Sequence, residues 1–400
     1  MRESVPYAWS LEGERVTKTG LTQHVPAIRR LAERWLAEVA DDPAVDAADG
    51  DFVCSPAGLW LALSAAAAGA RAGTAEELQS LLGFAGPDAA ATATAAADAL
   101  AETGGLLVAT GMWARIPMFR NYRESLPHIR FGHLDPNHSD ALAAVDAWVR
   151  KATRGLISTL PLSANQEALL ILVNVLSLKA DWATPFRPQD TADLPFTDWQ
   201  GVEHRVPTMF KKLPRPTHAW TAPGRSGSPV DVVALRCEAG YGQEPVQVSF
   251  VLGEPGRSAA EVLPAAWAPH ELRRPLDADA VTFTLPRLRL RTGLDVARSL
   301  GALGMKRAVS ELADFSGMSP EPLMISQIMQ ESLLKVNERG LEAAAVTGYT
   351  HVLSVSVRPA VIRHFAFDRP FGIVVFDGSG IPLFTAWQST APAGADRGGA

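Results

Sequence analysis

The sequence predicts an α+β fold in which helices fill most of the first half of the chain and β-strands fill most of the second. Helical spacing of apolar residues dominates up to about residue 156. A nearly continuous apolar run then occupies residues 167–182, and later segments are rich in β-branched and aromatic residues. Because these strand-like segments do not alternate with helices, the order argues against a doubly wound parallel sheet.

The predicted helices rest on apolar spacing and on capping residues. Ser55 can cap a helix over residues 55–69, Pro56 suits its first turn, and its small apolar body predicts burial on most sides. Thr74 and Glu77 are spaced as a capping box at the start of another helix. Helices are also predicted over residues 28–39, 74–83, 88–103 and 140–156.

The predicted strands begin with the apolar run at residues 167–182. It has no solvated face, which favours a strand in the middle of a covered sheet, although periodicity alone also permits a buried helix. The sequence DGSG at 377–380 is typical of a hairpin turn between the last two strands. Further strands are predicted over residues 230–237, 245–253, 280–293, 371–377 and 381–387.

Length and composition limit the classes of function. A chain of 400 residues with 47% hydrophobic residues can bury a large core. The net charge of -6 is not concentrated in a block, so nothing points to nucleic acid or to a membrane surface. Residues 1–20 lack the apolar core of a secretory signal, so a cytoplasmic location is predicted and an extracellular one is left open. The Ala, Arg and Gly bias is typical of a high-GC bacterial genome.

The chain shows no linker rich in Pro, Ser or Gly and no repeat at a fixed period. We therefore expect a short N-terminal segment at residues 1–24, one large domain over 25–390 and a disordered tail at 391–400.

Motifs for catalysis are missing from the sequence. The histidines are not spaced as metal ligands, no Gly-x-Ser-x-Gly turn is present, and Cys54 and Cys237 are too few for a disulfide framework. We therefore predict no metal, no cofactor and no enzymatic activity. Arg287, Arg289 and Arg291 alternate in PRLRLR, which favours one solvated face of a strand over a polyanion site.

Residues 336–359, VNERGLEAAAVTGYTHVLSVSVRP, combine alanines that favour helix with a β-branched run that favours strand. A connection longer than about fifteen residues between two sheet segments is expected to be functional or disordered. Its low charge and its Val, Tyr and Thr content argue against disorder. The segment is typical of one that exists both as an exposed loop and as a strand inside a sheet.

The motif NERGLEAAAVTG at 337–348 resembles the hinge of the reactive-centre loop of serpins, the serine protease inhibitor family. The resemblance covers about residues 25 to 390. It includes FVCSPAGLWLALSAAAAGARAGTAEELQSLLGF, VDAWVRKATRGLI, LVNVLSLKADWATPF, ADFSGM and FDRPFGIVVFDGSGIPLFTAW, in the order of the family.

The resemblance implies a serpin fold, with N-terminal helices packed on a large central mixed β-sheet, further sheets, and an exposed reactive-centre loop at about residues 338–362. It also implies a suicide-substrate mechanism, in which a protease cuts the loop and is trapped as an acyl-enzyme when the loop inserts into the main sheet. The implied partner is a serine protease of elastase-, subtilisin- or chymotrypsin-like specificity, and the chain is expected to act as a monomer.

The resemblance also implies a role for individual residues. The reactive bond is expected at Ser354-Val355, with Leu353-Ser354 as the alternative. The shutter under the main sheet is expected to comprise Ser55, Pro56, Asn174 and Gln330, and the breach at its end Trp182, Arg287 and Glu338. The hinge is expected to comprise Glu338, Gly340, Leu341, Ala343, Ala344, Ala345, Val346 and Thr347.

Two residues depart from the family pattern. Gln330 stands where many members carry a histidine, and its amide can still donate and accept hydrogen bonds. Leu341 stands where a small Thr or Ser is usual, and its bulk is expected to slow insertion. The alternative function is a non-inhibitory serpin that acts as a protease substrate, a binding protein or a storage protein.

Overall fold

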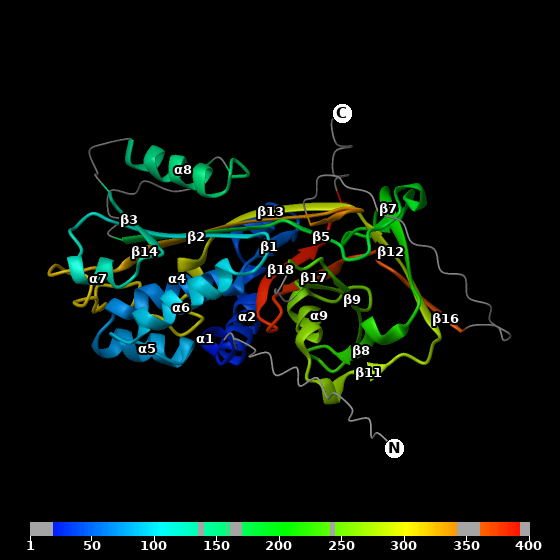
Figure 1. The fold of residues 1–400 in the computed structure, drawn as a ribbon, viewed down its shortest axis with the longest axis horizontal. Helices are drawn as coiled ribbons and strands as arrows, with labels where there is room; N and C mark the ends of the chain where they lie inside the picture. Colours follow the sequence, from blue (N-terminus) through cyan, green and yellow to red (C-terminus); the bar gives the residue numbers. More distant parts are fainter. Residues whose placement is uncertain are drawn as a thin grey trace, which may run out of the picture.

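The computed structural model describes residues 19–134, 140–157, 159–160, 170–240, 245–341 and 361–392. Most of its helices lie in the first half of the chain, as the sequence predicts (Figure 1). They are α1 Thr19–Thr22, α2 Val25–Val39, α3 Pro43–Asp46, α4 Pro56–Gly69, α5 Ala72–Leu82, α6 Ala89–Ala101, α7 Arg120–Glu124, α8 Asp140–Ala152 and α9 Ala259–Val262. Short 3-10 turns lie at Pro188–Asp190, Pro216–His218, Leu263–Trp267, His270–Leu272 and Val296–Ser299.

The strands form three sheets, of which one, here called the large sheet, carries the candidate site. Its strand order is β3-β2-β4-β14-β15-β5, and β13 pairs with the other edge of β14. Parallel and antiparallel pairs are mixed in it. Its strands are β2 Leu106–Ala114, β3 Ile129–His133, β4 Leu170–Leu178, β5 Ala180–Asp181, β13 Leu288–Asp295, β14 Ile325–Val336 and β15 Gly340–Leu341.

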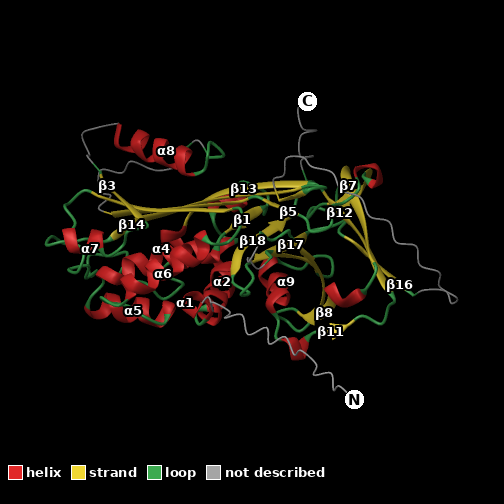
Figure 2. Cartoon of the chain, viewed as in Figure 1, coloured by secondary structure: helices red, strands yellow, loops and turns green. Residues whose placement is uncertain are grey.

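The other two sheets lie beside one end of the large sheet (Figure 2). One has the order β1-β18-β17-β10-β9-β8-β11, with β1 Phe52–Cys54, β8 Ala219–Pro223, β9 Pro229–Arg236, β10 Gln247–Leu252, β11 Arg274–Pro275, β17 Phe371–Phe376 and β18 Pro382–Gln388. The other has the order β16-β12-β7-β6, with β6 Ala192–Thr197, β7 Glu203–Leu213, β12 Ala280–Pro286 and β16 Ile362–Ala366. Helices plus these sheets confirm the predicted α+β class.

The two faces of the large sheet pack against different helices. On the inner face, α4 is buried along its whole length between the sheet and the helices α2, α5 and α6. On the outer face, α8 covers a separate apolar cluster of sheet residues (Figure 1). Because side chains alternate along a strand, β4 sends Leu172, Asn174 and Leu176 inward and Ile171, Val173 and Val175 outward.

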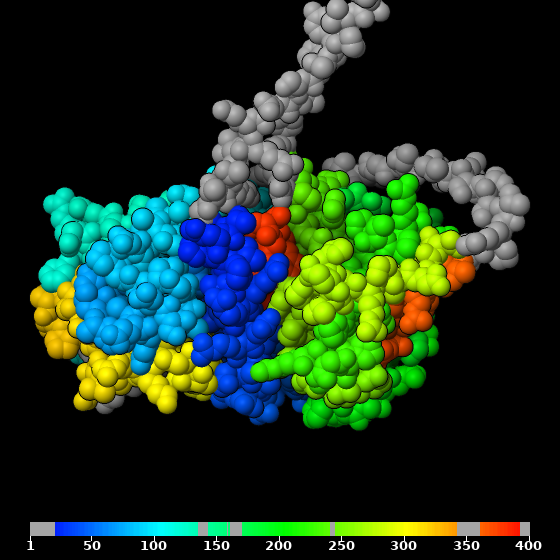
Figure 3. All heavy atoms as spheres, turned by 90° about the horizontal axis from the view of Figure 1, so that it is seen from below, coloured from blue at the N-terminus to red at the C-terminus, as the bar shows by residue number. Residues whose placement is uncertain are grey.

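The helix α2 occupies the middle of another face of the molecule. In the view from below, its blue segment lies between lighter blue residues on one side and green to yellow-green residues on the other, and part of the red C-terminal segment is visible beside it (Figure 3). Its buried residues, including Ile28, Leu31 and Trp35, repeat at the predicted helical spacing. Residues 19–22, inside the predicted N-terminal segment, form α1, and Leu21 is buried.

Two capping arrangements were predicted at helix starts, and the structure confirms the one at Ser55 but not the one at Thr74 and Glu77. The Ser55 hydroxyl accepts a hydrogen bond of 3.0 Å from the Gly58 amide, as a cap of α4 should. The capping box at Thr74 and Glu77 is wrong, because α5 already begins at Ala72. Both side chains instead accept backbone amides from residues 307 and 314, so distant partners displace the local cap.

The strand expectations need one correction. The predicted strand over 280–293 is two strands, β12 and β13, which belong to different sheets. The strand pairing is interrupted at Arg287, whose amide donates a hydrogen bond to the Pro207 carbonyl. Arg287 therefore does not share a strand face with Arg289 and Arg291, contrary to the expectation from PRLRLR. Strands β2, β3, β6, β7 and β8 were not predicted.

Candidate functional site: the seam of the large sheet

The contact between β4 and β14, here called the seam, is a parallel pair in the middle of the large sheet. Its register runs from Ile325 opposite Leu170 to Leu333 opposite Ser177, with one irregularity near Gln327. Each strand also has an antiparallel neighbour on its far side, β2 for β4 and β13 for β14. A strand placed in the seam would therefore exchange one parallel contact for two new ladders.

At one end of the seam the chain already folds back into it. Asn337 accepts hydrogen bonds through Oδ1 from the amides of Arg339 and Gly340, which closes a tight turn after β14. Leu341 then pairs antiparallel with Val336 on one side and with Ala180 on the other. The Leu341 side chain is 0% exposed. The start of the loop thus lies between the two halves of the sheet.

The turn is held by an ion pair at the predicted breach. Arg287 Nε donates to both carboxylate oxygens of Glu338, at 2.8 and 3.0 Å, and the Thr191 hydroxyl donates to the same carboxylate at 2.6 Å. Burial raises the pKa of the Glu338 carboxyl, but these hydrogen bonds outweigh that effect, and the net pKa is lowered. Glu338 therefore stays ionised at neutral pH.

The buried Trp182 contacts the same turn from the other side. Its indole Nε1 donates to the Asn337 carbonyl at 2.9 Å, and its amide donates to the Arg339 carbonyl at 2.7 Å. The Phe186 amide donates to the Glu338 carbonyl at 2.8 Å. The backbone of the turn is thereby fixed at three successive residues, which positions Gly340 at the mouth of the seam.

Lys211 lies next to this contact and was not found from the sequence. Its ammonium donates to the carbonyls of Thr184 and Pro185 and lies 4.7 Å from the centre of the Phe186 ring. Burial lowers the pKa of Lys211 to about 8. The sequence provides no signal for such a contact, because the partners of Lys211 are backbone carbonyls from another segment.

At the middle of the seam, Gln330 and Asn174 face the start of α4. The Gln330 amide accepts from the Ser55 amide at 2.6 Å and donates to the Ser55 carbonyl at 2.9 Å. It also lies 3.3 Å from Asn174 Oδ1, and Asn174 Nδ2 donates to the Thr110 hydroxyl at 2.9 Å. Both amides are buried. They join β2, β4 and β14 to the helix below.

The close packing of this cluster explains a glycine in α4. A Cβ added to Gly58 would lie 2.1 Å from Asn174 Oδ1 and 2.3 Å from a Leu176 methyl. Pro56 fills the first turn of the same helix and is buried. The start of α4 can therefore approach the seam only because residue 58 has no side chain.

The remaining arginines of PRLRLR lie on the outer face of β13. Arg291 pairs with Glu331 of β14 at 2.6 Å, and burial raises the pKa of the Glu331 carboxyl despite this partner. Arg289 lies opposite Lys335. Sequence patterns did not indicate Glu331 or Lys335, because their neighbours come from a strand distant in the chain.

The structure thus brings together the residues predicted for the shutter and those predicted for the breach, at two levels of one seam. Leu341, the first residue in the seam, is accommodated despite its bulk. The other predicted hinge and reactive-bond residues lie outside the described residues: Ala343, Ala344, Ala345, Val346, Thr347, Leu353, Ser354 and Val355.

The described residues hold no cluster of three His, Cys, Asp or Glu side chains that could bind a metal ion. None of their helices is long and apolar enough to cross a bilayer. Cys54 and Cys237 are both free and buried, and burial raises the pKa of each thiol to about 12.

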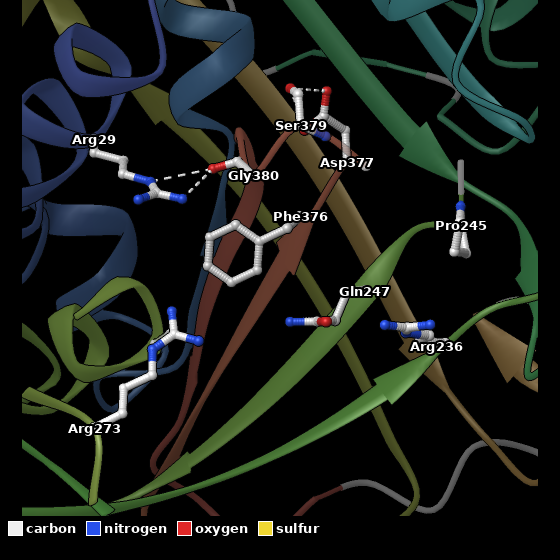
Figure 4. Close-up of a pocket in the computed structure, with 11 residues that line it drawn as sticks. Arg29, Arg236, Pro245, Gln247, Arg273, Phe376, Asp377, Ser379 and Gly380 are labelled. Atoms are coloured by element: carbon white, nitrogen blue, oxygen red, sulfur yellow. Dashed lines mark hydrogen bonds between the residues drawn. The ribbon is translucent and has the colours of Figure 1, made fainter. Parts of the chain in front are cut away.

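A cavity of about 540 Å³ lies away from the seam, between α2, β10 and the turn that joins β17 to β18. Arg29 and Arg273 reach it from one side and Arg236 from the other (Figure 4). Arg29 also donates to the Gly380 carbonyl, at 2.7 and 3.1 Å. Burial and the nearby Arg273 lower the pKa of Arg29. The arginines give this cavity a positive lining.

These features define the class of protein as an α+β fold built on one large mixed sheet, which has a parallel seam that the chain enters at one end. The family model for serpins, described as serine protease inhibitors, matches residues 28–387. This chain belongs to the serpin family.

Relatives support this assignment. The chain is 28% identical over 389 residues to serpin-Z1A of Triticum aestivum, covering 89% of this chain and 93% of the wheat protein. It is 30% identical to leukocyte elastase inhibitor of Bos taurus, a match that covers 58% of this chain and 61% of that one. The match to a serine protease inhibitor of Rattus norvegicus, also 30% identical, covers 60% of this chain and 55% of the rat protein. These relatives are named as serpins or inhibitors rather than enzymes.

Solved structures share the fold. Serpin48 of the insect Tenebrio molitor superposes with a TM-score of 0.76 at 24% identity, over 92% of this chain and 98% of that one. Arabidopsis AtSerpin1 in its native stressed conformation gives 0.74 at 22%, over 92% and 97%. Human thyroxine-binding globulin complexed with thyroxine gives 0.74 at 19%, over 94% and 100%.

Proposed function

We propose that this serpin inhibits a serine protease as a suicide substrate. The protease cuts the loop and forms an acyl-enzyme, and the cut loop then inserts into the seam and traps it. The observation that carries the proposal is the position of Gly340 and Leu341. In the uncut chain they form β15, which lies between β14 and β5 at one end of the seam. The family and the inhibitors among its relatives support it.

The register of Leu341 defines where the following residues would go. Continuing antiparallel from the pair with Val336 and Ala180, Ala345 would lie between Ser332 and Leu176, and Thr347 would reach Gln330 and Asn174. These positions share the inner face with Leu341. Small side chains there fit a layer that α4 already fills. This favours Ala343, Ala345 and Thr347 as the inward stem and Ala344 and Val346 as the outward one.

The energy of insertion is large enough to drive an irreversible change. The seam offers pairing for about ten residues, and each net hydrogen bond contributes ~0.5–1.5 kcal/mol. Insertion would therefore release on the order of ten kcal/mol, comparable with the whole stability of an ordinary domain. The uncut chain is then a kinetically trapped state.

The reactive bond is proposed at Ser354-Val355, with Leu353-Ser354 as the neighbouring alternative. The flanking HVLSVSV is small and apolar, which suits the specificity pockets of elastase-, subtilisin- or chymotrypsin-like enzymes. The similarity to an elastase inhibitor favours the first of these. Pro359 obstructs cleavage after Arg358, which disfavours trypsin-like enzymes.

A second candidate function is binding without inhibition, and the cavity at Arg29 favours it. Its three arginines would suit a small anionic molecule, and a structural neighbour, thyroxine-binding globulin, binds thyroxine. On this alternative the loop serves only as a protease substrate. The sequence of the loop does not favour this alternative. Charged residues or proline in the stem would oppose insertion, and residues 343–347 contain neither.

One experiment distinguishes these functions. The protein is mixed with subtilisin, pancreatic elastase and chymotrypsin, and the products are separated on denaturing gels. Inhibition predicts a covalent complex that survives SDS. Cleavage of the loop without any complex would contradict inhibition and favour the binding alternative, and intact protein with fully active proteases would contradict both the proposed loop chemistry and the proposed specificity.

A further inference from the structure

A row of cationic side chains crosses the seam on the outer face of the large sheet. Arg289 of β13 lies directly opposite Lys335 of β14. Leu333 pairs with Ser177 across the seam, and Leu341 lies between Val336 and Ala180, so Lys335 and Lys179 flank the position that follows Leu341 and belong to the same face. Arg289 and Lys179 are exposed and Lys335 is partly so.

Arg289, Lys335 and Lys179 form no ion pair with any described residue. The two arginines on either side of Arg289 in the sequence, Arg287 and Arg291, are both paired. Arg287 is paired with Glu338 and Arg291 with Glu331, which uses the carboxylates on either side of the row. Like charges directly opposite each other on adjacent strands destabilise a sheet. The row therefore carries an unfavourable energy in the uncut chain that a carboxylate between the strands would relieve.

The path of the loop delivers a carboxylate to this place. Leu341 lies between Val336 and Ala180 with its side chain on the inner face. The next residue of an inserted antiparallel strand lies between Lys335 and Lys179, and its side chain points to the outer face. That residue is Glu342.

We propose that Lys335, Lys179 and Arg289 are the receiving site for the Glu342 carboxylate, and that this ionic contact is the first step of loop insertion beyond Leu341. The inference rests on the proposed inhibitory function and adds a determinant of its rate. Native repulsion within the row and attraction in the inserted state act in the same direction. Both therefore favour the forward step, and they shift the outcome toward trapping the protease instead of releasing it.

The site also explains how a bulky Leu341 is compatible with insertion. Leu341 is already buried in the uncut chain, so the step that follows cleavage starts at Glu342. A charged residue that enters this row on the outer face loses less hydration than one that enters the inner face beneath α4. The rate of the first step is therefore set by electrostatics at the outer face.

The test measures insertion directly. Cys54 and Cys237 are buried, so a cysteine introduced at Val352 can be labelled selectively with an environment-sensitive dye. The dye signal follows insertion in stopped flow after mixing with subtilisin, and thermal unfolding of the cut protein reports whether insertion has occurred. The variants are Glu342→Gln, Lys335→Gln, their double mutant and the charge-swapped pair Glu342→Lys with Lys335→Glu. Lys306→Gln, an exposed lysine outside the large sheet, is the matched control.

Each single variant is expected to slow insertion about two- to fivefold, the upper part of the range for exposed ion pairs. The double mutant should be no slower than the singles, the charge swap should restore most of the rate, and added salt should slow the parent but not Glu342→Gln.

Two results would overturn the inference, and they are distinguishable. If the cut parent gains stability but Lys335→Gln inserts as fast as the parent and Lys306→Gln, the receiving site is wrong and the proposed inhibition stands. If the cut parent gains no stability, insertion does not occur, and both proposals fail together.

Discussion

Gln330 and Asn174 lie opposite each other across the seam, and Nε2 of Gln330 lies 3.3 Å from Oδ1 of Asn174. The same Gln330 amide exchanges two hydrogen bonds with the backbone of Ser55. Gln330 thus contacts Asn174 of β4 once and the backbone of Ser55, the residue that caps α4, twice. Inserting a strand must separate Gln330 from Asn174, so this contact opposes opening of the sheet.

Replacing Gln330 with leucine is expected to destabilise the uncut protein by about 1–3 kcal/mol, because the buried Ser55 amide loses its acceptor and the Ser55 carbonyl loses one of its two donors. Urea unfolding followed by fluorescence measures the change. Gln200→Leu, at an exposed turn, is the control and should shift stability by less than about 0.5 kcal/mol. Equal midpoints for the two variants would contradict the role of Gln330.

Replacing Arg287 with methionine should loosen the turn that holds Gly340 at the seam. The variant leaves Glu338 with only the Thr191 hydroxyl and the surrounding backbone, and a loss of about 1–3 kcal/mol is expected for this partly buried pair. Arg287→Lys should recover only part of the loss, because lysine cannot repeat the forked contact with both oxygens.

The comparison for Arg287 is Arg120→Met, which removes an exposed pair with Glu124. That pair should contribute little to stability. Inhibitory activity is then followed during storage at 37 °C. Faster loss in Arg287→Met than in Arg120→Met is expected, and identical decay would show that the ion pair does not hold the breach closed.

The burial of Lys211 predicts a rise of stability with pH. Its pKa is about 8 in the folded chain and lies near 10.4 in an unfolded chain, so between these values the folded state binds fewer protons. Stability contributed by the neutral amine is therefore present above the unfolded pKa and lost as the pH falls through about 8. Urea midpoints between pH 7 and 10 should rise by an amount equivalent to at most about 3 kcal/mol, and Lys211→Met should remove this rise.

Sequence patterns predicted the elements whose signals are local. The helices around α2 and α4, the apolar strand β4 and the last hairpin follow from spacing, capping and turn residues. Strands β2, β6 and β7 were missed, because their polar and small residues pair with strands distant in the sequence. The break at Arg287 was missed although Pro286, which cannot donate a ladder hydrogen bond, directly precedes it, because nothing local shows that the two strands enter different sheets.

The candidate site was predictable only through family resemblance. Neither Ser55 nor Gln330 carries a local signal of their contact, which spans 275 positions of the chain. Lys211 and Thr191 support the breach through backbone or side-chain contacts that no spacing rule indicates. Composition predicts a segment suited to two states, and only the register of Leu341 indicates which face each of its residues would occupy in an inserted strand.

Replacing Ala345 with arginine should convert the inhibitor into a substrate. In an inserted strand that continues the register of Leu341, this residue would lie on the inner face, between Ser332 and Leu176, which are both 0% exposed. An unpaired charge there costs several kcal/mol on insertion. Gel assays with subtilisin should show cut protein and little covalent complex, while Ala302→Arg, at an exposed position, should inhibit like the parent. Unchanged inhibition by Ala345→Arg would count heavily against insertion into the seam.

The start of the loop can lie between β14 and β5 only because residue 340 has no side chain. A Cβ at this position would lie 2.1 Å from the Ala180 carbonyl oxygen and 2.7 Å from the Asp181 Cα, both of them backbone atoms that cannot move aside as a side chain can. Gly340→Ala should therefore expel Leu341 from its place between Val336 and Ala180 and slow insertion after cleavage. Gly301→Ala is the control, because a Cβ there meets nothing within 4 Å. The number of inhibitor molecules consumed per protease should rise severalfold for Gly340→Ala alone. A ratio equal to that of the parent would mean that the contact of Gly340 with β5 has no part in insertion.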